Sequence, residues 1–456
     1  MNWCMLFTIV AVAMHRSVTA NVSVNLLDGA DLQLLYVTPS SSMPCPAEPC
    51  LTLTQFTQNP SSWMSSSTSL MFLCGSHTLN TNLSISNVNN FSMRTNSTTD
   101  ITLYVIRCQN QVSFNFENIT KLNIKGLMFT GCGGNTVSSI KNFTIENSAF
   151  QGRNDSSTVL DIASISLTIV NSSFSSNTVG RCWNIFSLNT IPHNISIRAG
   201  GAIFVDKSNV SIINCTFTNN SAEAGGAIYS TSKGTSNYYQ LNNDISISNS
   251  TFINNRANTD SHLFHYCDHA TDNRSAGGAI AVFQSKLKIT NCIFTNNTSD
   301  AGEGGVLAVQ QESTLSIHKS DFHGNSANSY GGVILMREIS ATIDGSVFNN
   351  NSANQGGVMH AIQRTSIVSR RNVFGNNSAK LSGGVLSMDQ KSELDDYCSR
   401  FLYNRAMAGG VLYAIRSGIT LKDMAVLFPI TKLRKAVVQC ISYRAIPTLL
   451  FQDDAI

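Results

Sequence analysis

Charged residues are scarce in this chain. Asp, Glu, Lys and Arg make up 12% of its 456 residues, about half the share that is usual in globular domains. The formal net charge of +3 indicates neither a nucleic-acid partner nor a basic membrane patch. Asn, Ser and Thr supply the polarity instead. Because 42% of the residues are hydrophobic and recur at regular positions, the composition excludes a disordered chain.

Long apolar runs are also missing. Residues 5–14 form a short apolar core, and Val18-Thr19-Ala20 offers small residues for cleavage before Asn21, so we predict a signal peptide over residues 1–20. No later stretch is long and apolar enough to form a membrane-spanning segment. We therefore expect a secreted, extracellular chain, or one that a partner holds at the cell surface.

Sequons of the form Asn-x-Ser/Thr occur 18 times, which favours a eukaryotic secretory route and a glycoprotein. Asn350 and Asn376 occupy equivalent positions in adjacent repeats, so we expect one of them to stay largely unmodified. The glycosylation candidates are Asn82, Asn118, Asn142, Asn209, Asn219, Asn249, Asn296, Asn350 and Asn376.

The twelve cysteines fit an oxidising compartment and disulfide bonds. Removal of Cys4 with the signal peptide leaves eleven, so at least one is unpaired or bonded to another chain. Cys45 and Cys50 are expected to tie down an N-terminal cap. Cys215 and Cys292 are expected to stay buried thiols, or to pair with cysteines such as Cys182.

Two short motifs recur in fixed order, about every 26 residues, as expected for a stacked repeat. One is Gly-Gly followed by aliphatic residues, with its glycine pairs at 200–201, 225–226, 277–278, 304–305, 331–332, 356–357, 383–384 and 409–410. The other is Phe-x-x-Asn, with its phenylalanines at 129, 150, 174, 217, 252, 294, 322, 348, 374 and 401.

Before each phenylalanine, apolar residues recur at every second position, as in a half-buried strand. Ile stands five positions before in eight of the ten repeats, and an apolar residue stands seven positions before in all ten. Ile and Phe are five positions apart, so a straight strand would place them on opposite faces. A bend between them is therefore required, and Asn suits it because Asn tolerates the left-handed backbone conformation. The asparagines at this bend are Asn147, Asn171, Asn214, Asn249 and Asn291.

These patterns predict an all-β fold, a single-stranded right-handed parallel β-helix of ten or more coils. Ile and Phe would stack in interior rows, and corner asparagines would form hydrogen-bonded ladders. We predict a cap over 21–50, the β-helix over 51–421, insertions at 178–199, 230–243 and 256–276, and a cap or truncated end over 422–456. A leucine-rich horseshoe would need Leu-x-x-Leu-x-Leu, which is absent.

The combination of Gly-Gly-Ala-Ile and Phe-x-x-Asn resembles the repeats of the chlamydial polymorphic outer-membrane proteins. It is also similar to right-handed β-helix proteins of the pectin-lyase-like superfamily. The resemblance covers roughly residues 50–421. Similarity to the chlamydial proteins implies surface display and adhesion. The sequence departs from the chlamydial pattern because we find no alternating-strand region for a C-terminal translocator barrel.

The residue three positions after each glycine pair is expected to point outward. That row contains no carboxylate, so it cannot supply the acid pair of a glycosidase, and we predict no catalytic residue and no cofactor. We interpret it as an exposed contact strip for a protein or a sugar, with candidates Phe204, Tyr229, Leu335, His360 and Tyr413.

His262, His265, Cys267 and His269 lie close together in one insertion. They are weak candidates for a metal, because their spacing matches no standard zinc module and a surface loop with a disulfide explains them equally well. We therefore predict no metal. The sequence favours a secreted, non-catalytic scaffold or adhesion protein that binds protein or carbohydrate at the cell surface or in the extracellular matrix, and no nucleic acid. The alternative is a polysaccharide lyase or glycoside hydrolase.

Overall fold

The computed structural model describes residues 32–40, 46, 49–95, 101–109, 112–152, 154–155, 158–163, 165–179, 199–231, 243–258, 276–300, 302–423, 425–427 and 438–441. The chain divides into unit 1, residues 1–153 and 159–173, and unit 2, residues 154–158 and 174–456. Both are built from parallel strands, and the fold is the predicted right-handed parallel β-helix. The predicted signal peptide lies outside the described residues.

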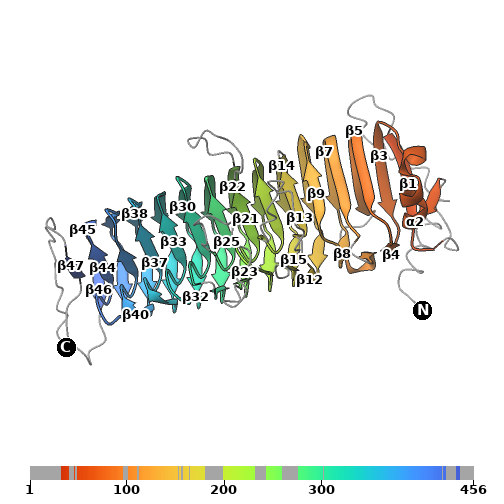
Figure 1. Ribbon diagram of the computed structural model, residues 1–456. Helices are drawn as coiled ribbons and strands as arrows, with labels where there is room; N and C mark the ends of the chain where they lie inside the picture. The colour runs from red at the N-terminus through yellow and green to blue at the C-terminus, as the bar shows by residue number, and fades with distance from the viewer. Residues whose placement is uncertain are drawn as a thin grey trace, which may run out of the picture. The chain divides into compact units, whose positions relative to one another are not determined.

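Unit 1 stacks long strands in one sheet and shorter strands in another (Figure 1). The longer stack contains β1 (Leu32–Thr38), β2 (Cys50–Thr52), β3 (Ser67–Phe72), β5 (Leu83–Thr95), β7 (Phe114–Lys125), β9 (Asn135–Ser138), β10 (Asn142–Glu146), β13 (Leu160–Ala163) and β14 (Ser166–Val170). The shorter contains β4 (Gly75–Leu79), β6 (Tyr104–Cys108), β8 (Met128–Thr130) and β11 (Ala149–Gln151).

The beginning of unit 1 corrects two boundaries. β1 pairs in parallel with β3, so the segment expected to be a cap already contributes a stacked strand. The predicted β-helix begins at residue 51, but the chain forms a helix, α2 (Leu53–Gln58), directly after β2. Thr52 accepts a hydrogen bond from the Gln55 backbone while the Gln55 side chain accepts one from the Thr52 backbone. This reciprocal cap stabilises a helix start. The short 3-10 helices η1 (Pro60–Trp63) and η2 (Ile101–Leu103) complete the unit.

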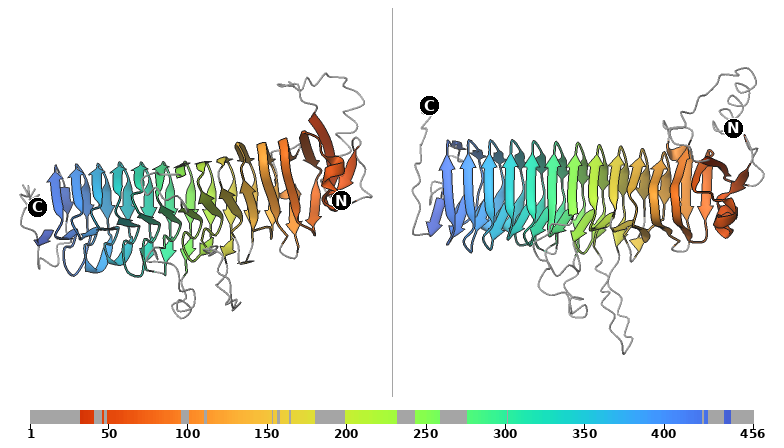
Figure 2. Two further views of the ribbon diagram at one scale, coloured as in Figure 1. Left: turned by 45° about the horizontal axis from the view of Figure 1, so that its top comes forward. Right: turned by 90° about the horizontal axis from the view of Figure 1, so that it is seen from above.

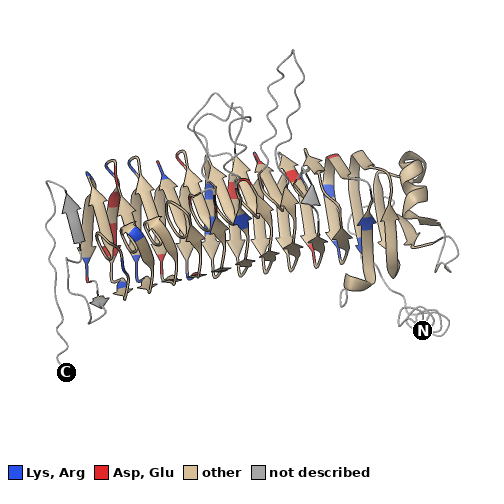
Figure 3. Ribbon diagram, turned by 60° about the horizontal axis from the view of Figure 1, so that its bottom comes forward, with Lys and Arg blue, Asp and Glu red and all other residues tan. Residues whose placement is uncertain are grey.

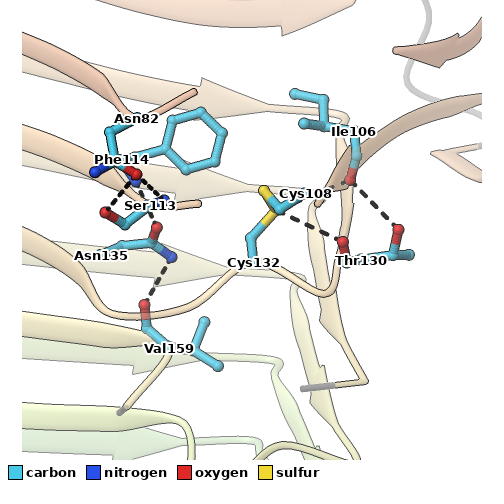
Figure 4. Close-up of a disulfide and its surroundings, with 9 residues drawn as sticks. All are labelled: Asn82, Ile106, Cys108, Ser113, Phe114, Thr130, Cys132, Asn135 and Val159. Carbon is cyan, nitrogen blue, oxygen red and sulfur yellow. Dashed lines mark hydrogen bonds between the residues drawn. A yellow bond between two sulfur atoms is a disulfide. The ribbon is translucent and has the colours of Figure 1, made fainter. Parts of the chain in front are cut away.

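A disulfide that the sequence analysis did not predict joins two neighbouring coils of unit 1. Cys108 at the end of β6 bonds to Cys132, 24 residues later (Figure 4). The buried Asn135 lies nearby, where its side-chain oxygen accepts from the Phe114 backbone and its amide donates to the Val159 carbonyl. Covalent and hydrogen-bonded links therefore both run from coil to coil here.

Unit 2 repeats four strands per coil, and Figure 2 shows the strands of successive coils lying side by side in one direction. The first-row strands follow the glycine pairs: β17 (Ile203–Asp206), β21 (Ile228–Thr231), β25 (Ile280–Phe283), β29 (Leu307–Gln310), β33 (Ile334–Arg337), β37 (Met359–Ile362), β41 (Leu386–Met388) and β44 (Leu412–Ile415). The second-row strands are β18 (Asn209–Ile213), β22 (Asn243–Ser248), β26 (Ser285–Thr290), β30 (Thr314–His318), β34 (Ser340–Asp344), β38 (Ser366–Arg370), β42 (Glu393–Tyr397) and β45 (Gly418–Lys422).

The other two rows are shorter. The third-row strands carry the repeat phenylalanines: β15 (Ser173–Ser175), β19 (Thr216–Thr218), β23 (Thr251–Ile253), β27 (Ile293–Thr295), β31 (Asp321–His323), β35 (Val347–Asn349), β39 (Val373–Gly375) and β43 (Arg400–Leu402). The fourth-row strands are β12 (Asn154–Asp155), β16 (Thr178–Val179), β20 (Ser221–Ala222), β24 (Arg256–Ala257), β28 (Thr298–Ser299), β32 (Ser326–Ala327), β36 (Ser352–Gln355) and β40 (Ser378–Ser382).

The predicted interior rows are confirmed. In unit 2 the phenylalanines stack face to face, as in the pair Phe322 and Phe348, whose ring centroids lie 4.8 Å apart. Phe322 and Phe348 are fully buried and paired in register. The aliphatic row behaves alike, since Ile289 pairs with Ile317 and Ile317 with Ile343. Stacked rings and aliphatic columns bury apolar surface in every coil, which stabilises the array.

Two asparagine rows flank the third-row strands. The bend asparagines predicted to be left-handed have that backbone, with φ between 47° and 52° from Asn147 to Asn291. The principal ladder is the second row, three residues after each phenylalanine. There Asn325 donates to the Asn351 side-chain oxygen, and Asn351 donates to that of Asn377. This buried ladder comprises Asn177, Asn220, Asn255, Asn297, Asn325, Asn351, Asn377 and Asn404.

The glycine pairs are required by backbone contacts at one corner. Gly304 has a φ of 62°, in the left-handed region that favours glycine. A Cβ on Gly305 would lie 2.6 Å from the Ser326 carbonyl oxygen and closer still to that of Gly332. A side chain at this second glycine would therefore push its coil away from the following one.

The stacking continues beyond residue 421, where the repeat pattern was predicted to stop. β46 (Ala425–Leu427) pairs in parallel with β43, and β47 (Val438–Ile441) pairs with β44. These strands lack the two motifs, so the sequence pattern did not indicate them. The predicted insertions fall mostly outside the described residues, at 180–198, 232–242 and 259–275.

Candidate functional site

The predicted contact strip is one row of residues, but it is not an exposed surface. Strand pairing aligns Phe204 with Tyr229, and Leu335 with His360. Tyr229, Leu335 and His360 are only 6%, 0% and 7% exposed, and Phe204 and Tyr413 are half-buried. The prediction of an open strip is therefore wrong at its centre.

Chain segments that lead into the glycine pairs cover this row. Tyr330, just before Gly331, stacks on His360 with ring centroids 4.6 Å apart. At the other end of the row, Tyr229 forms a small buried cluster with Ala199, Ala281, Phe283 and Ala308. Alternation within a strand predicts which way a side chain points, but not whether another part of the coil packs over it.

A polar cluster occupies the same covered side of β29, β33 and β37. Gln310 is fully buried, and neither atom of its side-chain amide has a hydrogen-bond partner. Its neighbour in register, Arg337, has a buried Nε without a partner, while another of its nitrogens lies 3.8 Å from a Glu303 carboxylate oxygen. Burial lowers the pKa of His360 to about 4, and Arg337 adds to that shift. His360 is thus neutral at pH 7 and closed off from solvent.

Two carboxylates with shifted pKa values, Asp344 and Asp396, have structural surroundings. Asp344 on β34 accepts two hydrogen bonds from Arg371 Nη2, and this guanidinium holds the pKa of the carboxyl below its usual value. Asp396 on β42 lies in the interior aliphatic row, in register with Ser369 and Leu421. Burial raises its pKa, although Ser369 and Ser399 oppose the shift by hydrogen bonding. Neither residue presents a carboxylate to an open cleft.

A cleft of about 490 Å³ lies along the fourth-row strands in unit 2. It extends across four successive coils, from β32 through β36 and β40 to Arg405, which forms a parallel bridge with Ser378. Its described lining residues include no Asp or Glu: they are Ser326, Ala327, Asn328, Ser352, Ala353, Asn354, Ser378, Ala379, Lys380, Arg405 and Ala406.

Cationic and apolar side chains gather at one end of this cleft. Lys380 and Arg405 line it and are exposed. Next to them in sequence are Leu381, 45% exposed, and Met407, 77% exposed; the Ala408 backbone N–H donates to the Leu381 carbonyl, which brings the two segments together. Figure 3 shows that charged residues are scattered along a ribbon that is otherwise uncharged. Sequence reasoning missed this site, although the small Ser-Ala pairs after the ladder asparagines repeat at its floor.

The nine predicted glycosylation asparagines are all exposed. Asn219, Asn296, Asn350 and Asn376 share one turn, with φ between 53° and 57°, directly before the buried ladder asparagine. The Asn376 side-chain amide nitrogen, the atom that would carry a glycan, donates to the Asn349 side-chain oxygen at 3.2 Å. The geometry leaves these asparagines accessible, and occupancy stays a prediction.

Among the cysteines that the structure describes, Cys50 and Cys74 are disulfide-bonded, in addition to the Cys108–Cys132 pair. Cys215 and Cys292 are buried, as predicted, and burial raises the pKa of the Cys292 thiol. The metal candidates His262, His265, Cys267 and His269 lie outside the described residues. Within the described part of the chain, no three metal-ligating side chains come together.

Comparison with known protein families gives a match to one repeat of this chain. Residues 214–231, which contain one Phe-x-x-Asn and one Gly-Gly-Ala-Ile motif, match the Chlamydia polymorphic membrane protein repeat. The molecule is therefore a parallel β-helix whose repeats are similar to those of that family. None of the described helices has the length and apolarity needed to cross a membrane. A search of curated proteins gives no match.

Solved structures give distant likenesses. One is ORF18 of Geobacillus virus E2, 10% identical, with a TM-score of 0.31 and coverage of 77% of this chain and 54% of the viral one. The chain thus spans about half the length of that protein. Another is a catalytic domain of a GH87 α-1,3-glucanase in complex with nigerose, 10% identical, with a TM-score of 0.30 and coverage of 85% of this chain and 68% of the glucanase chain.

Proposed function

We propose that this chain is a secreted, non-catalytic β-helix scaffold that binds a protein or carbohydrate partner at the cell surface or in the extracellular matrix. The observation that carries the proposal is the chemistry of the cleft across β32, β36 and β40. Its walls offer hydroxyl, amide and cationic groups, which bind polar partners. Its described lining residues include none of the paired carboxylates that glycoside hydrolysis uses.

Secretion is supported by the apolar segment at residues 5–14 and by the cysteines. Two disulfide-bonded positions besides Cys108–Cys132 suit an oxidising compartment. The exposed sequon asparagines suit the same route, because a glycan needs an accessible amide nitrogen on the surface. The chlamydial type of repeat adds an association with surface proteins.

Rigidity supports a scaffold role. The buried asparagine ladder and the phenylalanine stack connect every coil of unit 2 to the next, so neighbouring coils cannot shift independently. Such an array holds surface groups at fixed spacing, which favours binding over several coils at once. A catalytic site would need accessible acid or base groups, and His360 and Asp396, whose pKa values burial shifts, are both buried.

The experiment uses the full secreted protein, with folding verified by circular dichroism. The protein is incubated with neutral and acidic polysaccharides in the presence of calcium, and new reducing ends and unsaturated products are measured. Binding of labelled protein to cell surfaces and to extracellular matrix is measured in parallel. We expect saturable binding without turnover. Sustained release of products would overturn the proposal in favour of a polysaccharide lyase or hydrolase, and absence of any surface binding would contradict the scaffold role.

A further inference from the structure

The cleft along the fourth-row strands is built from repeated side chains. Its floor consists of small side chains, because Ala327, Ala353 and Ala379 are buried at the same position of three coils. Serines precede these alanines, and pairing sets Ser326 opposite Ser352 and Ser352 opposite Ser378. Adjacent strands lie about 4.8 Å apart, so the cleft presents a hydroxyl group at each such step.

The cleft has an excess of positive charge. Some arginines on these coils are neutralised, as Arg371 is by Asp344 and Arg416 is by Asp389. Lys380 and Arg405, in contrast, have no acidic partner among the described residues, although both line the cleft. Unpaired cations beside neutral hydroxyl and amide groups attract an anionic partner and can donate charge-assisted hydrogen bonds to it.

The shape of the cleft selects among anionic partners. It crosses four coils in line, so it fits an extended chain better than a compact ion. A membrane surface is flat and would meet the rim without filling the cleft. A polysaccharide has rings about as long as the coil spacing, with hydroxyl groups that can pair with successive serines. Its apolar C–H faces can pack against the exposed Leu381 and Met407 at the rim.

We propose that this cleft binds a linear anionic polysaccharide, sulfated or carboxylated, whose chain crosses β32, β36 and β40 and whose acidic groups contact Lys380 and Arg405. The inference rests on the proposed non-catalytic binding function and names its ligand class. The polysaccharide also contacts the side-chain amides of Asn328 and Asn354, which line the cleft. Sequon residues Asn350 and Asn376 lie two positions before the lining residues Ser352 and Ser378, so glycans there would lie near the bound polymer.

The test measures binding of the full secreted protein to immobilised heparin, polygalacturonate and neutral dextran, before and after enzymatic deglycosylation. The variant K380E/R405E reverses the two cleft cations. The matched control K391E/R400E makes the same change in net charge on two other exposed cations of the same coils, which do not line the cleft. The variant N354E places a carboxylate in the cleft without touching either cation.

We expect binding to heparin or polygalacturonate, no binding to dextran, and affinity that falls as salt rises. K380E/R405E should weaken binding at least tenfold and N354E several-fold, whereas K391E/R400E should change it by less than about twofold. Equal losses in the cleft and control variants would overturn the inference, because the attraction would then be diffuse. Binding to phosphatidylserine vesicles or to an acidic peptide, without binding to either polysaccharide, would also overturn it.

The two proposals fail in different ways. If cell-surface binding persists in K380E/R405E and no polysaccharide is cleaved, the scaffold function stands and the assignment of the cleft is wrong. If the wild-type protein cleaves a polysaccharide, the non-catalytic function is wrong, whichever residues bind the polymer.

Discussion

The buried asparagine ladder yields the sharpest prediction about stability. Asn351 takes part in four side-chain hydrogen bonds: its oxygen accepts from the Asn325 backbone and side chain, and its amide donates to the Phe322 carbonyl and the Asn377 side chain. Asn351 is 0% exposed, so water does not replace these partners. At about 1 kcal/mol for each hydrogen bond, Asn351→Ala should lower the free energy of unfolding by about 4 kcal/mol.

Two further variants calibrate this value. Asn404, at the far end of the ladder, takes part in three such bonds, so Asn404→Ala should cost about 3 kcal/mol. Asn354, on the same coil as Asn351, has no side-chain hydrogen bond and is half-buried, so Asn354→Ala should change stability by less than about 0.5 kcal/mol. All three substitutions keep the sequon at Asn350.

The assay combines urea unfolding, followed by circular dichroism, with hydrogen exchange of peptides from residues 320–380. Exchange is needed because repeat arrays can unfold in segments, so that one global transition does not describe them. Faster exchange in Asn351→Ala should extend to the coils on either side. The reasoning is refuted if Asn351→Ala and Asn354→Ala have the same stability and the same exchange rates.

Three other predictions concern ionisation and modification. Because the pKa of His360 is lowered to about 4 in the folded protein, the unfolded chain binds a proton more readily. The free energy of unfolding should therefore fall by about 3 kcal/mol as the pH drops from 6.5 to 4. His360→Leu should reduce this loss in urea titrations, and an unchanged pH profile in this variant would contradict the prediction. Asp396 has a raised pKa in an aliphatic row, so its ionisation opposes folding at neutral pH and Asp396→Leu should stabilise by about 1–3 kcal/mol; a lower melting temperature at pH 7 would count against this. Glycopeptide mapping should find Asn350 and Asn376 not both fully modified, and full occupancy of both would refute the expected crowding.

The fold was predictable from sequence because each coil repeats the same local requirements. The spacing of Ile317 and Phe322 and of their equivalents fixes which side chains enter the interior, and one coil then predicts the next. Strands at the two ends escaped prediction where they lack the motifs, as β1 and β47 do. The helix α2 was missed because the cap formed by Thr52 and Gln55 overrides the local strand pattern.

The candidate site was less predictable because it depends on contacts between segments. The row that contains Tyr229 and His360 was assigned to an outward-facing surface, yet Tyr330 and the small residues before the glycine pairs close over it. Conversely, Lys380 and Arg405 belong to different repeats and are unremarkable in sequence. They form a site only because coil stacking brings them to one cleft.

The close backbone contacts at the second glycine of the pairs from 200–201 to 383–384 bear on how such a chain can change over generations. A Cβ on Gly305 would meet the carbonyl oxygens of Gly332 and Ser326, and a Cβ on Gly332 would meet the equivalent oxygens one coil later. The contacts between one coil and the next are therefore of the same kind along this part of the array. Duplication or loss of one whole coil would create no new type of contact, whereas a single Cβ at this corner would be intolerable. Copy number should accordingly vary more freely among descendants of this gene than the identity of either glycine.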